Sequence, residues 1–148
     1  MISKADAEAA GLEPELLQPS VSGTQIKRYR DWTSDQLIIY TTRETPLQEF
    51  PNTAQYLARF KHLNTCPEVA EDKHPWWALH RPRDPQIFAS PKFVGITTAK
   101  TIELIYDFDS SIYVTDAMYV FSLLPQWQPN SFAFMAILQS KISSCYTA

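Results

Sequence analysis

The sequence predicts an α+β fold, a mostly antiparallel sheet flanked by helices, as one domain over residues 1–148. Short runs rich in β-branched and aromatic residues follow one another between residues 92 and 124, with turns too short for helical crossovers. Segments with apolar residues at helical spacing lie near the start, the middle and the end of the chain. A chain of 148 residues can bury a core without disulfides or metals.

The first predicted element is a short helix over residues 4–10. Ser3 can cap its N-terminus, with Asp6 at the capping-box position, and Gly11 stands just past its end.

The middle of the chain predicts one strand and one longer helix. Residues 35–41 form a short run of β-branched and aromatic side chains, as expected of a buried strand. After a loop over residues 46–51, Asn52 or Thr53 can start a helix that continues to Leu63.

The last third predicts several strands and a closing helix. Three or four strands are expected, with candidates at residues 92–97, 101–106, 111–115 and 117–124. Their short Asp- and Ser-rich turns favour an antiparallel meander. Ser131 is expected to cap a final helix over residues 132–143, and residues 66–73 are expected to be a polar connector.

The distribution of charge allows a cationic face on one part of the protein but does not favour strong non-specific binding of nucleic acid. Net charge is −3, with one lysine against four acids in residues 1–26 and again in 101–148. Residues 27–100 hold eleven Lys or Arg against eight acids, a surplus of +3.

No residue pattern predicts a catalytic or cofactor site. The chain has three glycines and no glycine-rich turn, which a nucleotide or S-adenosylmethionine site on a Rossmann-like sheet requires. The three histidines and two cysteines have no metal-type spacing. The sequence also shows no signal peptide and no run of eighteen apolar residues, so a reduced, cytoplasmic setting with no membrane partner is expected.

The most informative stretch is residues 74–94, HPWWALHRPRDPQIFASPKFV. Adjacent tryptophans, then His80, Arg81 and Arg83, stand among four prolines. Interleaved aromatic and cationic groups are typical of surfaces that bind a polyanion with planar bases. The competing interpretation is that Trp76 and Trp77 belong mainly to the core and hold a loop that presents the arginines.

Six short phrases occur in a recognisable order over nearly the whole chain. They are PSVSGTQIKRY at 19–29, LIIY at 37–40, YLARFK at 56–61, WWALHR with PKFV at 76–81 and 91–94, YVTD at 113–116 and AILQSKI at 136–142. In this order they resemble the C-terminal target-recognition (specificity) domain of TaqI-like adenine-specific DNA methyltransferases, including fused type II restriction–modification enzymes. Gln139 departs from the asparagine usual in the last phrase.

The resemblance implies a DNA-recognition fragment of a larger enzyme from a bacterium or archaeon. Its partners would be double-stranded DNA and an upstream catalytic domain. S-adenosylmethionine and the residues for adenine-N6 methylation would lie in that domain. Residues 1–148 would hold no catalytic, cofactor or metal site, and the parent would act in restriction–modification or phage defence, with or without endonuclease activity.

The resemblance implies two kinds of DNA contact. Contacts to phosphates position the protein on the duplex, and contacts to base edges read the DNA sequence. Arg81 and Arg83 are the expected base readers, because a guanidinium can donate two hydrogen bonds to the edge of a guanine. His80 and Gln86 are weaker candidates. The expected phosphate contacts are Lys27, Arg28, Arg30, Arg59, Lys61, Lys92 and Lys100. Lys92 could instead protect a sheet edge, and Arg28 could simply brace the opening segment.

Two other function classes remain open from the sequence. Acidic ends and exposed aromatic residues would also suit a protein-interaction module of a phage-defence or restriction complex, without direct base readout. A small stand-alone enzyme is disfavoured because no catalytic constellation occurs.

Overall fold

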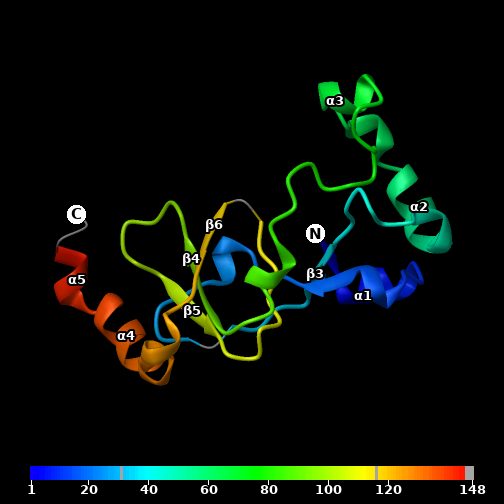
Figure 1. Cartoon of the computed structure of the whole chain (residues 1–148). Helices are drawn as coiled ribbons and strands as arrows, with labels where there is room; N and C mark the ends of the chain where they lie inside the picture. The colour runs from blue at the N-terminus through cyan, green and yellow to red at the C-terminus, as the bar shows by residue number, and fades with distance from the viewer. Residues whose placement is uncertain (31, 116, 146–148) are drawn as a thin grey trace. The chain divides into compact units, whose positions relative to one another are not determined.

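The computed structural model describes residues 1–30, 32–115 and 117–145, with side chains through residue 143 in the last range (Figure 1). The chain divides into two compact units, residues 1–18 with 35–83 and residues 19–34 with 84–148. We call them the first and the second unit and describe each by itself. The single domain expected over residues 1–148 stays a prediction.

Each unit combines helices with a small sheet. The chain is therefore a mixed α/β structure, compatible with the predicted α+β class, and it has two three-stranded sheets where one was expected. Among the described residues, no helix is long and apolar enough to cross a membrane.

The sheet of the first unit has the strand order β1–β3–β2. These strands are β1 (Ile2–Ser3), β3 (Gln36–Ile39) and β2 (Leu17–Pro19). Strand β1 runs antiparallel to β3, with Ile2 opposite Leu37. The predicted strand at residues 35–41 is thus confirmed over its centre, but its residues are half-buried rather than buried.

Helix α1 (Lys4–Ala9) follows β1 directly and forms as predicted. The Ser3 hydroxyl oxygen accepts a hydrogen bond from the Asp6 backbone N–H at 3.0 Å, and Gly11 has a φ of +61°. The buried cluster beneath it consists of Ile2, Ala7 and Leu12, with Ala10, Leu17, Leu37, Ile39 and Tyr56 packed against it.

Helix α2 (Pro51–Ala58) receives its cap from a distant part of the chain. The Glu13 carboxylate accepts hydrogen bonds from the backbone N–H groups of Asn52 and Thr53, at 3.0 and 2.8 Å, and from the Thr53 hydroxyl at 2.6 Å. These bonds satisfy N–H groups that an α-helix leaves without an internal partner. Pro51 already occupies the first helical position, so the helix begins earlier than predicted.

Helix α2 also ends earlier than predicted, because the hydrogen bonds after Ala58 tighten to the i→i−3 pattern. The shorter helices of this unit are η1 (Pro14–Leu16), η3 (Leu47–Glu49), η4 (Lys61–Leu63) and α3 (Pro67–Ala70). Helix α3 lies where a polar connector was expected.

The sheet of the second unit has the order β5–β4–β6, with both pairs antiparallel. The strands are β4 (Lys92–Ile96), β5 (Leu104–Asp107) and β6 (Met118–Phe121). Antiparallel pairing is confirmed, but the predicted meander is wrong: β6 pairs with β4 rather than with β5.

One continuous core stabilises the second unit. Its buried members are Val21, Ile26, Phe88, Val94, Ile105, Ile112, Val114 and Met118. The 19–34 segment, with η2 (Gly23–Gln25), contributes two of them, and η5 (Pro85–Ile87) leads into Phe88.

The strand predicted at residues 111–115 does not form. The Asp107 carboxylate accepts hydrogen bonds from the backbone N–H groups of Ser111 at 3.2 Å and Ile112 at 2.9 Å. These amides are therefore unavailable to a β-ladder. Tyr113 pairs with Ser20 in an isolated parallel bridge instead of a ladder.

The final helix predicted over residues 132–143 is broken at Gln139. Helix α4 spans Ser131–Leu138 and α5 spans Lys141–Cys145, after η6 (Pro125–Asn130). The Gln139 carbonyl accepts a hydrogen bond from the Tyr29 hydroxyl at 2.5 Å, and its side-chain amide donates to the Leu104 carbonyl at 3.0 Å. Ser131 does not cap α4, because its hydroxyl donates to the Gln128 carbonyl at 2.7 Å.

Candidate functional site: an anchored arginine loop and a Cys–Glu–His cluster

The end of β3 holds the loop that carries the predicted base readers. The Thr41 hydroxyl donates to the Trp77 carbonyl at 2.6 Å, and the Leu79 N–H donates to the Thr41 carbonyl at 2.9 Å. The Tyr40 hydroxyl donates to the Arg83 carbonyl at 2.7 Å. We call residues 76–83 the arginine loop. Its path is therefore fixed through main-chain atoms.

A third anchor comes from the segment after η4. The Asn64 amide donates to the Trp76 carbonyl at 3.2 Å, and the Lys61 ammonium lies 5.4 Å from the centre of the Trp76 ring. Two of the predicted cations, Arg59 and Lys61, thus lie just before Asn64, and Lys61 itself contacts the loop through Trp76. Arg59 itself stands over the rings of Tyr56 and Phe60, at 5.5 and 5.8 Å.

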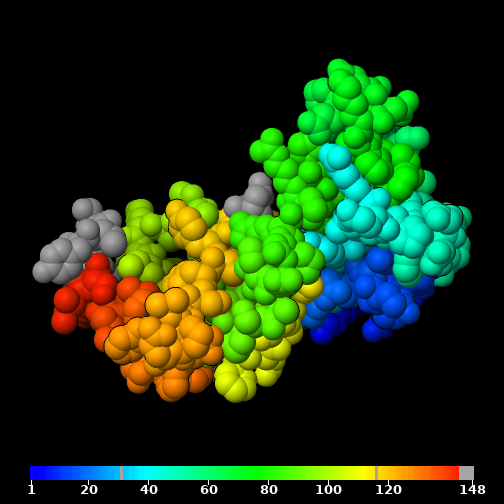
Figure 2. Space-filling model, in the orientation of Figure 1, coloured from blue at the N-terminus to red at the C-terminus, as the bar shows by residue number. Residues whose placement is uncertain are grey.

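Trp76 and Trp77 are half-buried and meet edge to face, with ring centroids 5.8 Å apart. They lie outside the two buried apolar clusters, so they brace the loop without belonging to the centre of the core. A hollow of about 330 Å³ adjoins them, lined by Lys61, Lys73, His74 and both indoles among others. In the space-filling view, the green segment around residues 60–80 forms an exposed surface of the first unit (Figure 2).

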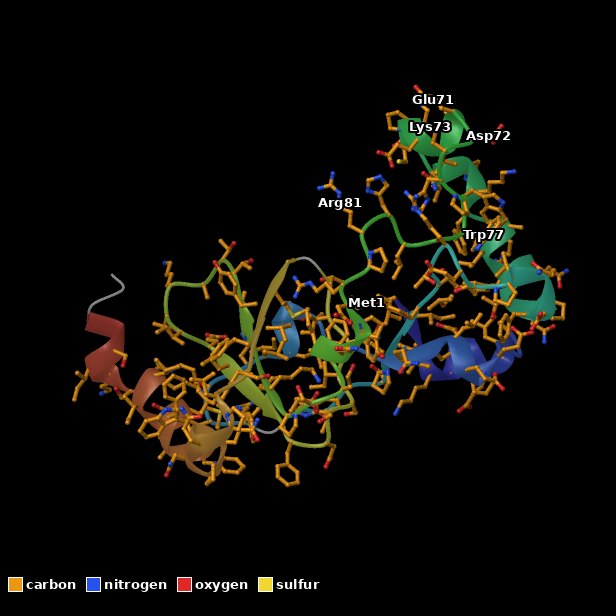
Figure 3. The ribbon with its side chains drawn as sticks, in the orientation of Figure 1. Met1, Glu71, Asp72, Lys73, Trp77 and Arg81 are labelled. Atoms are coloured by element: carbon orange, nitrogen blue, oxygen red, sulfur yellow. The ribbon has the colours of Figure 1, made fainter. Side chains whose placement is uncertain are left out.

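The two arginines of the loop differ in exposure. Arg81 is exposed, and its side chain extends outward from the loop (Figure 3). Arg83 is half-buried, and its carbonyl is the one that Tyr40 binds. An outward guanidinium on a fixed backbone is an arrangement that suits recognition of a planar hydrogen-bonding partner.

The other predicted contacts lie in the second unit. Lys27 is exposed and pairs with Glu103 at 3.6 Å, while the Arg28 guanidinium lies 5.5 Å from the centre of the Tyr29 ring. Arg30 and Lys100 are exposed. The predicted cations are therefore shared between the two units.

The prediction of Lys92 as a phosphate contact is wrong. Its side chain is fully buried and forms an ion pair with the equally buried Asp107, its cross-strand partner. The ammonium also donates to the Phe88 carbonyl at 3.0 Å. Since β4 is the central strand, Lys92 does not protect a sheet edge either.

A cluster that the sequence did not predict lies beside the arginine loop. One ligand atom each of Cys66, Glu68 and His80 lies within 4.8 Å of the others. His80 Nε2 is 2.7 Å from a Glu68 carboxylate oxygen, and this hydrogen bond, with the charge of His80, lowers the pKa of Glu68 below its ordinary value. The sequence signal is a Cys-x-Glu pair followed twelve residues later by a histidine, which matches no common ligand spacing.

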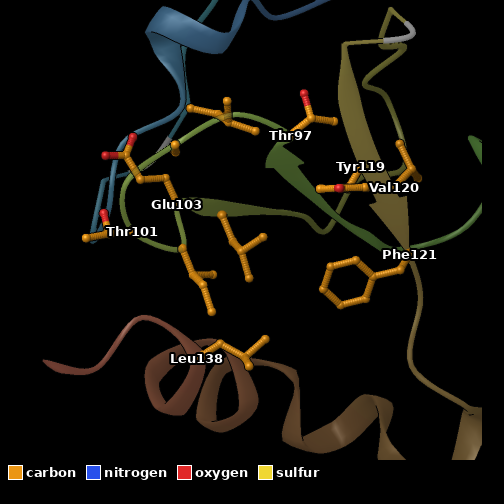
Figure 4. Close-up of a pocket in the computed structure, with 11 residues that line it drawn as sticks. Thr97, Thr101, Glu103, Tyr119, Val120, Phe121 and Leu138 are labelled. Carbon is orange, nitrogen blue, oxygen red and sulfur yellow. The ribbon is translucent and has the colours of Figure 1, made fainter. Parts of the chain in front are cut away.

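The second unit has an exposed apolar surface around its C-terminal helices. Its large exposed side chains are Leu124, Trp127, Phe132, Ile137 and Ile142. The segment from residue 124 to α4, in orange in Figure 2, faces the viewer there. A mainly apolar pocket of about 480 Å³ opens between the sheet and α4, with Tyr119, Phe121 and Leu138 in its lining (Figure 4).

Comparison with known proteins gave no family: no family model and no curated protein matches this chain.

Proposed function

We propose that this chain is the target-recognition domain of an adenine-N6 DNA methyltransferase of a restriction–modification or phage-defence system. Its task would be to position duplex DNA for a catalytic domain outside these residues, where S-adenosylmethionine would bind. Two domains are needed because moving an adenine out of the base stack costs a few kcal/mol. Binding of the flanking duplex by the second domain must offset this cost. The proposal rests on the six ordered phrases and on the geometry of the arginine loop.

The anchored arginine loop is the observation that carries this proposal. Tyr40, Thr41 and Asn64 bind main-chain atoms of the loop, while Arg81 remains exposed. A base-reading side chain needs this combination, because about 1–3 kcal/mol of discrimination per bidentate contact depends on correct placement. Arg59 and Lys61, and separately Lys27, Arg28, Arg30 and Lys100, would supply phosphate contacts.

The test is the double substitution Arg81→Ala and Arg83→Ala in the full-length protein that contains this chain. We expect loss of site-specific methylation and weaker binding to the cognate duplex, by tenfold or more. Lys4→Ala, which removes an exposed cation on α1, is the matched control and should change neither. Unchanged site-specific methylation in the double variant would refute the assignment of these arginines.

The enzyme class has a separate test in the reading frame upstream of this segment. A glycine-rich cofactor turn and an Asn-Pro-Pro-aromatic motif there would support the proposed class. A parent chain with neither feature would contradict it, whatever the arginine loop does.

The exposed apolar surface of the second unit favours a second candidate, a protein-interaction module. Several large apolar side chains between Leu124 and Ile142 are exposed, and exposed apolar patches are typical of interaction surfaces. Salt dependence separates the two candidates: DNA binding should weaken steeply between about 50 and 200 mM salt, whereas an apolar protein interface should not.

A further inference from the structure

We propose that Cys66, Glu68 and His80 bind a Zn²⁺ ion. This site is independent of the proposed DNA function, since it rests only on the donor atoms and their placement.

The three donor atoms are already close enough for a shared ion. They lie within 4.8 Å of one another. Zinc–ligand distances of about 2.0–2.3 Å in a tetrahedron place ligand atoms roughly 3.5 Å apart. Small side-chain rotations therefore suffice, and both His80 and Glu68 are about half exposed, which leaves them room to rotate.

Backbone hydrogen bonds hold the two segments that carry the donor residues, residues 66–74 and the arginine loop, in place without the ion. The Cys66 N–H donates to the Asn64 side chain at 3.1 Å, and its carbonyl accepts from the first turn of α3. The Glu68 carbonyl accepts from the N–H groups of Lys73 and His74 at 2.8 and 3.1 Å. These bonds close the 66–74 segment, and the anchored arginine loop then brings His80 back to it.

The chemistry of the donors favours zinc over the hard cations Mg²⁺ and Ca²⁺. One thiolate, one imidazole and one carboxylate form a mixed set that suits a borderline ion, whereas Mg²⁺ and Ca²⁺ prefer oxygen donors alone. The Cys66 thiol would release its proton to solvent on binding, and the thiolate and carboxylate together would balance the charge of the ion.

His74 gives a second and independent indication of a ligand. It is 96% buried, and its ring lies 5.3 Å from that of His80. Its Nδ1 lies 2.8 Å from the Pro75 carbonyl oxygen, so Nε2 is the ring nitrogen that this contact leaves without a partner. That Nε2 is buried and, within the described part of the chain, has no hydrogen-bond partner. Buried polar atoms are rarely left without a hydrogen-bond partner, and a water bound to the ion in its fourth position would supply one.

The test is metal titration of the whole chain carrying Cys145→Ser, so that Cys66 is its single thiol. Co²⁺ is expected to bind one equivalent, giving a thiolate charge-transfer band and the strong visible bands of a tetrahedral ion. Zn²⁺ is expected to displace it at the same stoichiometry and to slow alkylation of Cys66.

Three variants and two matched controls connect the ion to its ligands. Cys66→Ser, Glu68→Gln and His80→Gln should each weaken Zn²⁺ binding tenfold or more, and Cys66→Ser should abolish the charge-transfer band. His62→Gln and Glu71→Gln, which change exposed residues of the same types outside the cluster, should leave the affinity within twofold. The proposal is overturned if no thiolate band appears, if Zn²⁺ leaves alkylation of Cys66 unchanged, or if all three variants bind zinc as tightly as the parent.

Discussion

An ion pair is buried in the second unit, whereas charged side chains of the candidate site are exposed in the first. In the second unit, Lys92 is fully buried against Asp107 beneath a continuous apolar core. In the first unit, the apolar cluster is small, and Arg81, Glu68 and His80 remain open to solvent on segments held by main-chain hydrogen bonds. The comparison teaches that a cation close to aromatic residues has one of two roles. Where an apolar core buries the cation, it stabilises the fold; where no core covers it, it stays available for binding.

The largest expected effect is the loss of the buried ion pair. Lys92→Met should lower the free energy of unfolding by about 3–5 kcal/mol, because the buried Asp107 carboxylate loses its counter-charge. Urea unfolding measures it. Lys100→Met removes an exposed cation just beyond the same strand and should cost less than about 0.5 kcal/mol. Equal effects of the two would break the contrast between buried and exposed cations.

The next effect probes how tightly the second unit is packed. An added Cβ at Gly95 would lie 2.5 Å from Cδ2 of Leu104, so Gly95→Ala should destabilise by about 1–3 kcal/mol. At Gly23 the nearest atom would be 3.9 Å away, and Gly23→Ala should have little effect on the unfolding midpoint. A tolerated Gly95→Ala would show that β4 and β5 are less closely packed than the structure indicates.

A smaller effect concerns the first unit and depends on pH. Burial raises the pKa of Glu13, but hydrogen bonds from Thr53 and Asn52 outweigh it and lower the pKa from 4.5 to about 2. The carboxylate therefore stabilises the fold fully above pH 4.5, and this contribution is lost as the pH falls towards 2.

Glu13→Gln tests this cap. It should cost about 1 kcal/mol at pH 7, as the loss of a helix cap does, and progressively less in acid. Unfolding midpoints at several pH values measure the difference. Glu15→Gln, at an exposed neighbour, should show no such pH dependence, and a parallel loss in both variants would argue against a specific cap.

The smallest effect is expected at the anchor of the arginine loop. Tyr40→Phe removes the hydroxyl that binds the Arg83 carbonyl and should cost about 0.5–1.5 kcal/mol. Hydrogen exchange should quicken within residues 76–83, and Tyr119→Phe, at an exposed tyrosine, should leave it unchanged. An unchanged exchange rate in Tyr40→Phe would mean that Thr41 and Asn64 fix the loop without Tyr40.

Local patterns predicted the elements that are marked by signals within a few residues. Helix α1 with its Ser3 cap and strand β4 formed as expected, because capping and burial periodicity act within a few residues. The errors came from distant partners. Glu13 caps α2 from 39 residues away, and Tyr29 binds the carbonyl at which the last helix breaks, 110 residues further on.

In the candidate site, too, the sequence predicted what depends on neighbouring residues and missed what depends on distant ones. The arginine loop was found because its residues are consecutive, whereas the Cys66–Glu68–His80 cluster depends on a turn of the chain that local spacing does not encode. Lys92 was misassigned because its sequence neighbours do not show that β6 pairs on the far side of β4. The DNA role of the remaining cations stays a prediction.

Main-chain anchoring has a consequence for how the arginine loop can change. Tyr40, Thr41 and Asn64 bind backbone atoms of residues 76, 77, 79 and 83, so none of these contacts depends on the side chains at positions 81 and 83. The exposed side chain at position 81 can therefore be exchanged while these contacts keep the path of the loop. A set of variants at this position would present many chemical groups on one unchanged support, and new binding preferences could be selected from it without redesigning the fold.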